Sequence, residues 1–317
     1  MVNVEAISLD EYTRDVLPHS ASLWAHGRSL EVYAGDLREF AESGYGRRRF
    51  RFAGIRDGGA FVTSCKIYER ELRCGDRMLR AIGIGAVFTR KSHRGRGLAT
   101  LLLGALLDRE RAAGTDVAYL FSDIRPQFYE DLGFKTLPSR IFTLRADSLA
   151  FERIAPSPIK SDDWTLVARC FAMLDAHRPY ALHRTPLVWE MLRERRSGPG
   201  RVNIAIRSGR RILAYCLGRR EIESDAFVVD EFSFAGLQHA HLVPPLLRAA
   251  AGDLRKITGW LPPAPARHAL PRGSVRTRRD GITMVAPLSS IAHARWKRDS
   301  REILRAPSDT VWSADHV

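Results

Sequence analysis

The stretch from Ile82 to Leu107, which reads IGIGAVFTRKSHRGRGLATLLLGALL, constrains the fold more than any other part of the chain. Its first third is apolar and rich in residues that favour strands, and its middle is basic and rich in glycine. Its last third has the i, i+3, i+4 spacing of a helix, with an apolar stripe expected at Leu98, Leu101, Leu102, Ala105 and Leu106. The stretch therefore predicts a strand, a tight basic turn and a helix that begins at the turn.

A unit of this kind is suited to holding a phosphate group. The first backbone N–H groups of a helix have no partner inside the helix, and the helix dipole places partial positive charge there. Gly95 and Gly97 let the backbone approach an anion closely, and Arg94 and Arg96 add full positive charges. The turn has the spacing of neither a Walker A motif nor a G-x-G-x-x-G motif. For this fragment taken alone, the alternative is a basic surface turn that binds nothing.

A second motif follows the helix and a further apolar strand, Val117–Phe121. The pair R-x-x-G-x-A at Arg94–Ala99 and F-Y-x-x-x-G-F at Phe128–Phe134 resembles the acetyl-CoA signature of the GNAT N-acetyltransferases. Within that family the chain most resembles the enhanced intracellular survival type of bacterial enzyme, because of its V-F-T-R-K-S-H-R-G-R-G run, the strand that ends in Phe-Ser, and a second half of similar size. The resemblance implies an N-acetyltransferase that uses acetyl-CoA as co-substrate, with an amine acceptor and no metal.

The resemblance also implies roles for particular residues. Main-chain groups of the strand would bond the pantetheine amides, and the turn would hold the pyrophosphate. The donor-binding residues are then Val87, Phe88, Thr89, Arg94, Gly95, Arg96, Gly97, Leu98, Ala99, Thr100 and Ser122. Tyr129 would act as a general acid near the CoA sulfur, and a tyrosine packed in the core is the alternative. Gly83 and Gly85 inside the strand favour a bulge or a close approach of the backbone.

The general base is left open by the sequence. Many relatives carry a carboxylate on the strand before the turn, but Ile82–Thr89 contains none. The candidates elsewhere are Glu69, Glu71, Asp123, Asp230, Glu231 and the terminal carboxylate of Val317. In the resembled family the chain terminus can reach the active site. The alternative for this tail is that it packs only for stability, as the aromatic Trp312 near the end suggests.

The second half repeats the element order of the first: helices, a hairpin, a strand, a helix and a strand. Its turn between Phe234 and Leu242 has no arginine and no R-x-x-G-x-A. We therefore expect an α/β (α+β) fold of tandem acyl-CoA N-acyltransferase (GNAT-like) domains, with a mixed central sheet, a splayed parallel strand pair and a degenerate second domain. The expected domains are 1–150 (catalytic, completed by a strand at Arg140–Arg145), 151–290 (degenerate) and 291–317 (tail).

Composition narrows the remaining choices. The net charge of +14 fits a polyanionic ligand such as CoA, an acidic partner or nucleic acid, but the charges are scattered and arginine richness alone also explains them. The N-terminus has no signal-like pattern, no apolar run approaches the roughly 20 residues of a membrane span, and the four cysteines form no C-x-x-C, so we expect a cytoplasmic protein with reduced thiols. The acceptor would be a small-molecule or peptide amine. The alternatives are a non-catalytic acyl-CoA-binding regulatory protein, and another acyl or aminoacyl transferase on the same fold.

Overall fold

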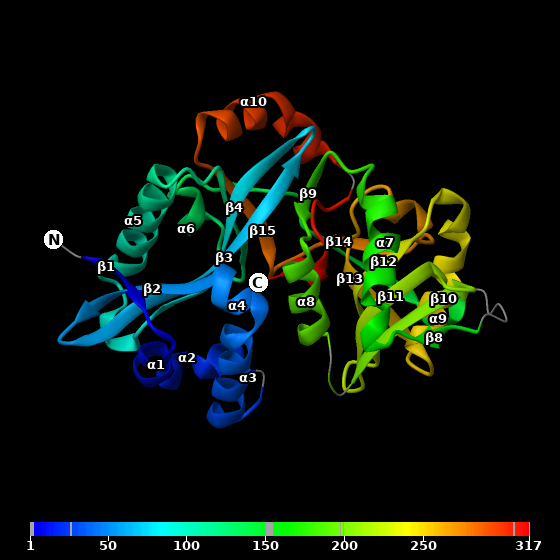
Figure 1. The fold of residues 1–317 in the computed structure, drawn as a ribbon, viewed down its shortest axis with the longest axis horizontal. Coiled ribbons are helices and arrows are strands. Elements are labelled where there is room, and N and C mark those ends of the chain that lie inside the picture. Colours follow the sequence, from blue (N-terminus) through cyan, green and yellow to red (C-terminus); the bar gives the residue numbers. More distant parts are fainter. Residues whose placement is uncertain are drawn as a thin grey trace.

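The computed structural model describes residues 3–25, 27–149, 155–196, 198, 200–306 and 308–316. Two lobes lie side by side, each built on one mixed sheet, and the C-terminal tail enters between them (Figure 1). This is the mixed tandem architecture that the sequence predicts. The boundary expected at residue 150 falls on Ala150 and residues 151–154, which lie outside the described residues, as does Val317.

The first sheet has the strand order β1-β2-β3-β4-β5-β15-β6, and β9 pairs with the far end of β3. Among the described strands of this sheet, only β4 and β5 pair in parallel. The strands are β1 (Val4–Ile7), β2 (Phe50–Asp57), β3 (Ala60–Cys74), β4 (Arg77–Thr89), β5 (Val117–Ser122), β6 (Lys135–Thr136), β9 (Tyr180–His183) and β15 (Ile282–Pro287).

Helices cover both faces of this sheet. On one face lie α5 (Leu98–Ala112) and α6 (Gln127–Glu130). The opposite face is covered by the N-terminal helices α1 (Leu9–Glu11), η1 (Tyr12–Val16), α2 (Leu17–Trp24), α3 (Leu30–Glu42) and α4 (Gly44–Arg49). Side chains of a strand alternate between the two faces, so Cys65 and Ile67 of β3 pack with α5, and Lys66 faces the N-terminal helices.

The helix α5 forms as expected, but its buried stripe is shifted by one position. Leu102, Leu103, Leu106 and Leu107 pack against the sheet, whereas Leu101 is exposed. The expected stripe was right at Leu102 and Leu106 and wrong at Leu101 and Ala105, which are exposed, because both registers place leucines at helical spacing and only the sheet decides which row is buried.

The second sheet has the order β14-β7-β13-β12-β11-β10-β8. In the part of the chain that the structure describes, its one parallel pair is β12 with β13, the counterpart of β4 with β5. The strands are β7 (Arg140–Arg145), β8 (Ser157–Pro158), β10 (Arg201–Ser208), β11 (Arg211–Glu221), β12 (Ala226–Phe234), β13 (Lys256–Trp260) and β14 (Ser274–Thr277). The associated helices are α7 (Trp164–Asp175), α8 (Pro186–Arg195) and α9 (Val243–Ala251), and α10 (Ser290–Arg305) precedes the tail.

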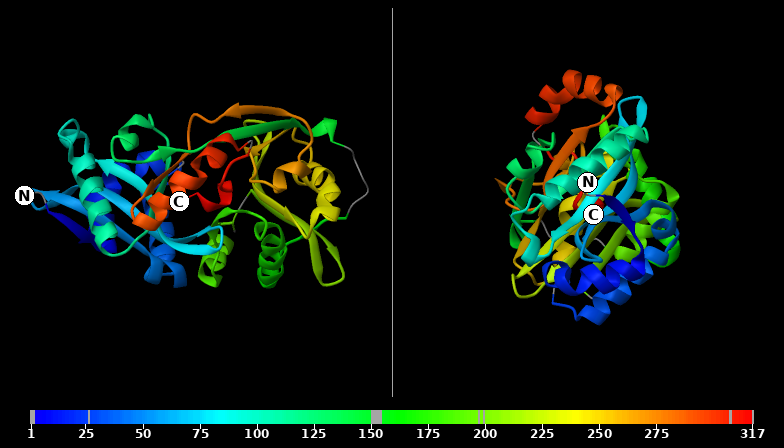
Figure 2. Two further views of the ribbon diagram at one scale, coloured as in Figure 1. Left: turned by 90° about the horizontal axis from the view of Figure 1, so that it is seen from above. Right: turned by 90° about the vertical axis from the view of Figure 1, so that its left-hand side faces the viewer.

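The two sheets exchange strands. The strand β7, expected to complete the first sheet, pairs instead with β13 and β14 of the second, so that expectation was wrong. Its place beside β5 is taken by β15, which comes from the far end of the second half. The crossing segments, green near residue 140 and orange near residue 280, run between the lobes (Figure 2). The boundaries expected near residues 150 and 290 therefore do not separate the sheets, and each lobe is incomplete without the other half of the chain.

Candidate functional site

The parallel strands β4 and β5 part from each other in the middle of the first sheet. They pair from Ala81 with Val117 to Ile84 with Leu120. β4 then continues to Thr89 without β5, paired only with β3. A bulge in β4 opposite Cys65 accompanies the separation, because Lys66 pairs with Gly85 while Ser64 pairs with Phe88. Ala86 within the bulge has a φ of 46°, an uncommon conformation for a residue with a side chain.

The bulge sets which backbone groups face the gap. The Arg90 N–H donates to the Val62 carbonyl at 2.8 Å, and the Phe88 carbonyl accepts the Thr63 hydroxyl at 2.8 Å, so both residues direct their main-chain groups toward β3. Because these groups alternate along a strand, Val87 and Thr89 direct theirs toward the gap. Phe88, also predicted to meet pantetheine, directs its carbonyl toward β3, and its side chain is buried.

The basic turn leads directly from this gap into α5. Gly95 and Gly97 have φ values of 76° and 72°, and no atom lies within 4 Å of a Cβ added at either position. The first helical N–H that finds its i−4 carbonyl is that of Leu101, 3.0 Å from the Gly97 oxygen, and no side chain caps the helix. The N–H groups of Leu98, Ala99 and Thr100 therefore point out of the helix end.

Two arginines flank this helix end. Arg94 is exposed and its Nε donates to the Thr89 carbonyl at 3.2 Å, which ties the turn to the end of β4. Arg96 lies 3.5 Å from Asp57 in the β2–β3 hairpin. The open glycines, the outward N–H groups and the two guanidinium groups together fit a pyrophosphate.

Tyr129 lies on α6, on the same face of the sheet as α5. Its ring packs edge-on against Phe128 at 4.9 Å and Phe134 at 6.0 Å, and 7% of the residue is exposed. Burial, reinforced by the charge of Asp123, raises the pKa of the Tyr129 hydroxyl to about 12. The hydroxyl therefore stays protonated near neutral pH, as a proton donor requires.

Ser122 lies at the end of β5, at the open end of the gap. Its hydroxyl donates to the Ile124 carbonyl at 2.9 Å and accepts the Ile124 N–H at 3.3 Å. The side chain is thus committed to the turn that follows β5. Asp123, one of the candidate bases, accepts the Gly281 N–H at 2.8 Å.

The other candidate bases are also engaged elsewhere. Glu69 projects from β3 on the α5 face and lies 3.5 Å from Arg51. Glu71 pairs in register with Arg80 and His183, away from the gap. Asp230 and Glu231 are buried in the second sheet in ion pairs with arginines, and the carboxylate of Val317 lies outside the described residues.

The second lobe repeats the bulge, but its described residues do not repeat the basic turn and open helix end of the first lobe. β12 carries one extra residue at Asp230, where Arg196 Nη1 lies 2.5 Å from the carboxylate and Arg201 Nη1 2.8 Å away. The helix that follows, α9, has Pro244 and Pro245 in its first turn, and proline has no N–H to offer. This agrees with the prediction that the second domain is degenerate.

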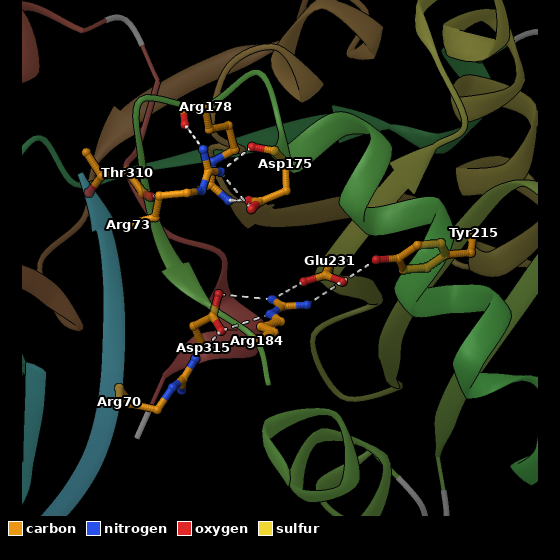
Figure 3. A network of polar contacts seen from close by, with 9 residues as sticks. All are labelled: Arg70, Arg73, Asp175, Arg178, Arg184, Tyr215, Glu231, Thr310 and Asp315. Carbon is orange, nitrogen blue, oxygen red and sulfur yellow. Dashed lines mark hydrogen bonds and ion pairs between the residues drawn. The ribbon is translucent and has the colours of Figure 1, made fainter. Parts of the chain in front are cut away.

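The tail links the two lobes through buried ion pairs (Figure 3). Asp315 lies between Arg70 of β3 and Arg184, which follows β9, and Arg184 also contacts Glu231 of β12. The ring of His316, the last described residue, lies tilted against Phe121 of β5, with 4.9 Å between the ring centres. The tail therefore reaches the C-terminal end of β5, where β4 and β5 part.

Sequence reasoning missed Lys66. It lies on β3 opposite Gly85, is 7% exposed, and faces the N-terminal helices. The available signal was its position as the single charged residue within the run AFVTSCKIY, which reads as a strand buried on both faces.

Two absences hold for the described residues. No group of three or more His, Cys, Asp or Glu side chains is placed to hold a metal ion. Within those same ranges, no helix is long and apolar enough to cross a membrane.

Comparison with known proteins agrees with this geometry. Residues 9–137 match the family described as "Acetyltransferase (GNAT) domain". No curated protein sequence matches the chain. A GCN5-related N-acetyltransferase from Kribbella flavida is similar in structure, with a TM-score of 0.69 and 20% identity over 92% of this chain and 72% of that one.

Two further structures have the tandem architecture or the predicted type. Eis1 from Mycobacterium abscessus is similar with a TM-score of 0.59 and 13% identity, over 91% of this chain and 74% of that one. A tandem GNAT protein from the clavulanic acid biosynthesis pathway gives a TM-score of 0.53 and 13% identity, over 91% of this chain and 99% of that one. Residues 9–137 are therefore similar to a GNAT acetyltransferase domain, and the chain as a whole has the fold of tandem GNAT-like proteins.

Proposed function

We propose that this protein is an acetyl-CoA-dependent N-acetyltransferase of the cytoplasm that moves an acetyl group to an amine by direct attack in a ternary complex. The observation that carries the proposal is the gap between β4 and β5, because β4 leads from this gap through the basic turn into the uncapped N-terminus of α5. Few other uses account for a strained bulge, an opened strand pair and a basic helix end in one continuous segment.

The described residues divide the donor between them in this proposal. The N–H groups of Leu98–Thr100, with Arg94 and Arg96, hold the pyrophosphate. Val87 and Thr89 bond the pantetheine amides in the manner of an added strand. This places the thioester in the gap, between the face that carries Tyr129 and the face that carries the N-terminal helices.

The chemistry then requires little beyond positioning. A neutral amine attacks the thioester carbonyl, a C–N bond forms and the C–S bond breaks. Tyr129 donates its proton to the departing sulfur, which its high pKa permits because the hydroxyl is fully protonated beforehand. Backbone N–H groups facing the gap stabilise the charge that develops on the carbonyl oxygen.

Calorimetric titration with acetyl-CoA tests the donor site. Arg94→Ala removes a charged hydrogen-bond donor from the pyrophosphate and should weaken binding by about tenfold or more. The matched control is Arg145→Ala, another exposed arginine paired with a nearby group on the far lobe, which should bind as the wild type does. Equal affinities for the two variants would contradict the assignment of the turn.

A screen of small amines and peptides, read by release of free CoA thiol, tests turnover. Tyr129→Phe should lower kcat by roughly 10²–10⁴-fold with little change in acetyl-CoA affinity. Binding of acetyl-CoA without acetylation of any amine would favour a non-catalytic regulatory protein. Turnover only with longer acyl-CoA, or with an aminoacyl donor, would favour another transferase on the same fold.

A further inference from the structure

A lysine is buried beside the bulge of β4, on the face opposite α5 and Tyr129. Lys66 pairs in register with Gly85, next to the strained Ala86. It projects on the same side of β3 as Ser64 and Tyr68, because alternate residues share a face. It therefore lies below the N-terminal helices, on the side from which an acceptor can approach a thioester held in the gap.

The surroundings of Lys66 contain aromatic rings and cations. Its Nζ donates to the Tyr33 hydroxyl of α3 at 3.2 Å, and lies 5.4 Å from the centre of the Tyr33 ring and 5.7 Å from that of Tyr12 in η1. The charged neighbours that act on it are Arg28, which precedes α3, and Arg195 of α8. Among the described residues, no carboxylate lies within ion-pair distance of Nζ.

This environment favours the neutral amine. Burial, and then the positive charges of Arg195 and Arg28, lower the pKa of Lys66 to about 7. A lysine of this kind can accept a proton near neutral pH, and an exposed lysine cannot. Once protonated, its ammonium group meets the faces of the Tyr12 and Tyr33 rings, which stabilise a cation.

Among the buried hydroxyls on this face that have no hydrogen-bond partner in the described residues are those of Ser64 and Tyr119. Ser64 lies on β3 and pairs in register with Phe88 of β4. Tyr119 lies on β5, and its Oη covers Gly83 of β4. Both residues are at least nine-tenths buried, so each unpaired hydroxyl carries a desolvation cost. Polar groups of a bound acceptor would satisfy them, which marks this layer as the place where the acceptor lies.

We propose that Lys66 is the general base of the reaction: its neutral ε-amine takes a proton from the ammonium group of the acceptor. The inference rests on the proposed acetyltransferase function. The neutral acceptor nitrogen then forms the C–N bond as the C–S bond breaks. Tyr129 gives its proton to the sulfur. The acetylated nitrogen then loses a second proton, which restores the Tyr129 hydroxyl, and Lys66 returns its own proton to solvent. This places the general base, Lys66, and the general acid, Tyr129, on opposite faces of the sheet.

The test is the pH profile of kcat/KM with the fastest aliphatic amine found in the acceptor screen. In the wild type the rate should rise as pH increases through about 7, because the base works only when neutral. Lys66→Met removes the base and should lower kcat/KM by roughly 10²–10⁴-fold and abolish that limb. Lys66→Arg keeps a positive charge but cannot give it up, and should be as impaired as Lys66→Met. Lys297→Met, at an exposed position of α10, is the control and should behave as the wild type does.

Calorimetry with acetyl-CoA accompanies each variant, and unchanged affinity shows that the fold and the donor site persist. An active Lys66→Arg variant would show that the site needs charge rather than a base, which overturns the inference. The inference would also be overturned if Lys66→Met kept the wild-type pH profile of kcat/KM. The same holds if the rise of kcat/KM through pH 7 were lost only on deletion of Val317. In each of these cases the acetyltransferase function stands. A protein that binds acetyl-CoA and acetylates no amine overturns both proposals.

Discussion

The buried carboxylate of Asp315 should be among the most costly side chains in the protein to neutralise. Its Oδ1 lies 3.0 Å from Arg70 Nη2 and 3.1 Å from Arg184 Nε, and its Oδ2 lies 2.9 Å from Arg184 Nη2 (Figure 3). Both arginine side chains are at most 1% exposed. Although burial opposes it, the two guanidinium groups hold the pKa of Asp315 below its usual range.

The substitution Asp315→Asn preserves the shape of the side chain and removes its charge. Arg70 and Arg184 are then left with Glu231 as the one buried carboxylate in their network, so one buried positive charge becomes uncompensated. Breaking a buried ion pair on one side costs about 3–5 kcal/mol. Urea unfolding followed by tryptophan fluorescence measures this directly, because Trp312 packs 5.3 Å from Phe232 near the end of the tail.

The control for this experiment is Asp147→Asn, which removes the partner of the exposed Arg145 and should leave the midpoint unchanged. The pH dependence has a definite sign. A carboxyl whose folded pKa is lowered stabilises the fold above its unfolded pKa of about 4, and that stability is lost as pH falls. A cost below about 1 kcal/mol for Asp315→Asn would refute the conclusion that this tail locks the two lobes together.

Three further outcomes follow from single positions. Gly97→Ala should cost about 1–2 kcal/mol of stability and weaken acetyl-CoA binding, because Gly97 has a φ of 72°. Gly104 lies inside α5 with open space where a Cβ would be, so Gly104→Ala should stabilise the fold by about 0.5–1 kcal/mol. Urea unfolding measures both changes. Burial raises the pKa of the Cys65 thiol to about 12, so this thiol should react with Ellman's reagent only on unfolding. Burial, opposed by Arg278, raises the pKa of Asp309 to about 7. The protonated carboxyl therefore stabilises the fold at low pH, and this contribution is lost as pH rises from about 4 to 7. The fall in melting temperature between pH 5 and pH 8 should be smaller in Asp309→Asn than in the wild type, and an equal fall would contradict this.

The strand, turn and helix of the proposed donor site could be predicted because their signal is local. The strand, turn and helix of residues 82–107 adjoin in sequence, and Gly95 and Gly97 specify positive φ on their own. The same is true of the degenerate second half, where the absence of an arginine in the turn is visible by inspection. What sequence could not give was which row of leucines in α5 meets the sheet, since that depends on packing.

The side proposed for the acceptor could not be predicted because its structure depends on contacts distant in sequence. β7 and β15 are both short apolar strands, and nothing in either pattern says which sheet each one joins. Asp315 reads as an ordinary polar tail residue until Arg70 and Arg184, more than 100 residues away, are brought against it. Lys66 likewise becomes chemically distinct only when the N-terminal helices cover it.

Hydrogen exchange of the backbone amides, with and without acetyl-CoA, tests whether the donor binds in the gap between β4 and β5. We expect acetyl-CoA to slow exchange at Val87 and Thr89 in the gap and at Leu98–Thr100 at the start of α5, and to leave the corresponding region of the second lobe around Val243 unchanged. Protection around Val243 without protection at Val87 and Leu98–Thr100 would contradict this expectation.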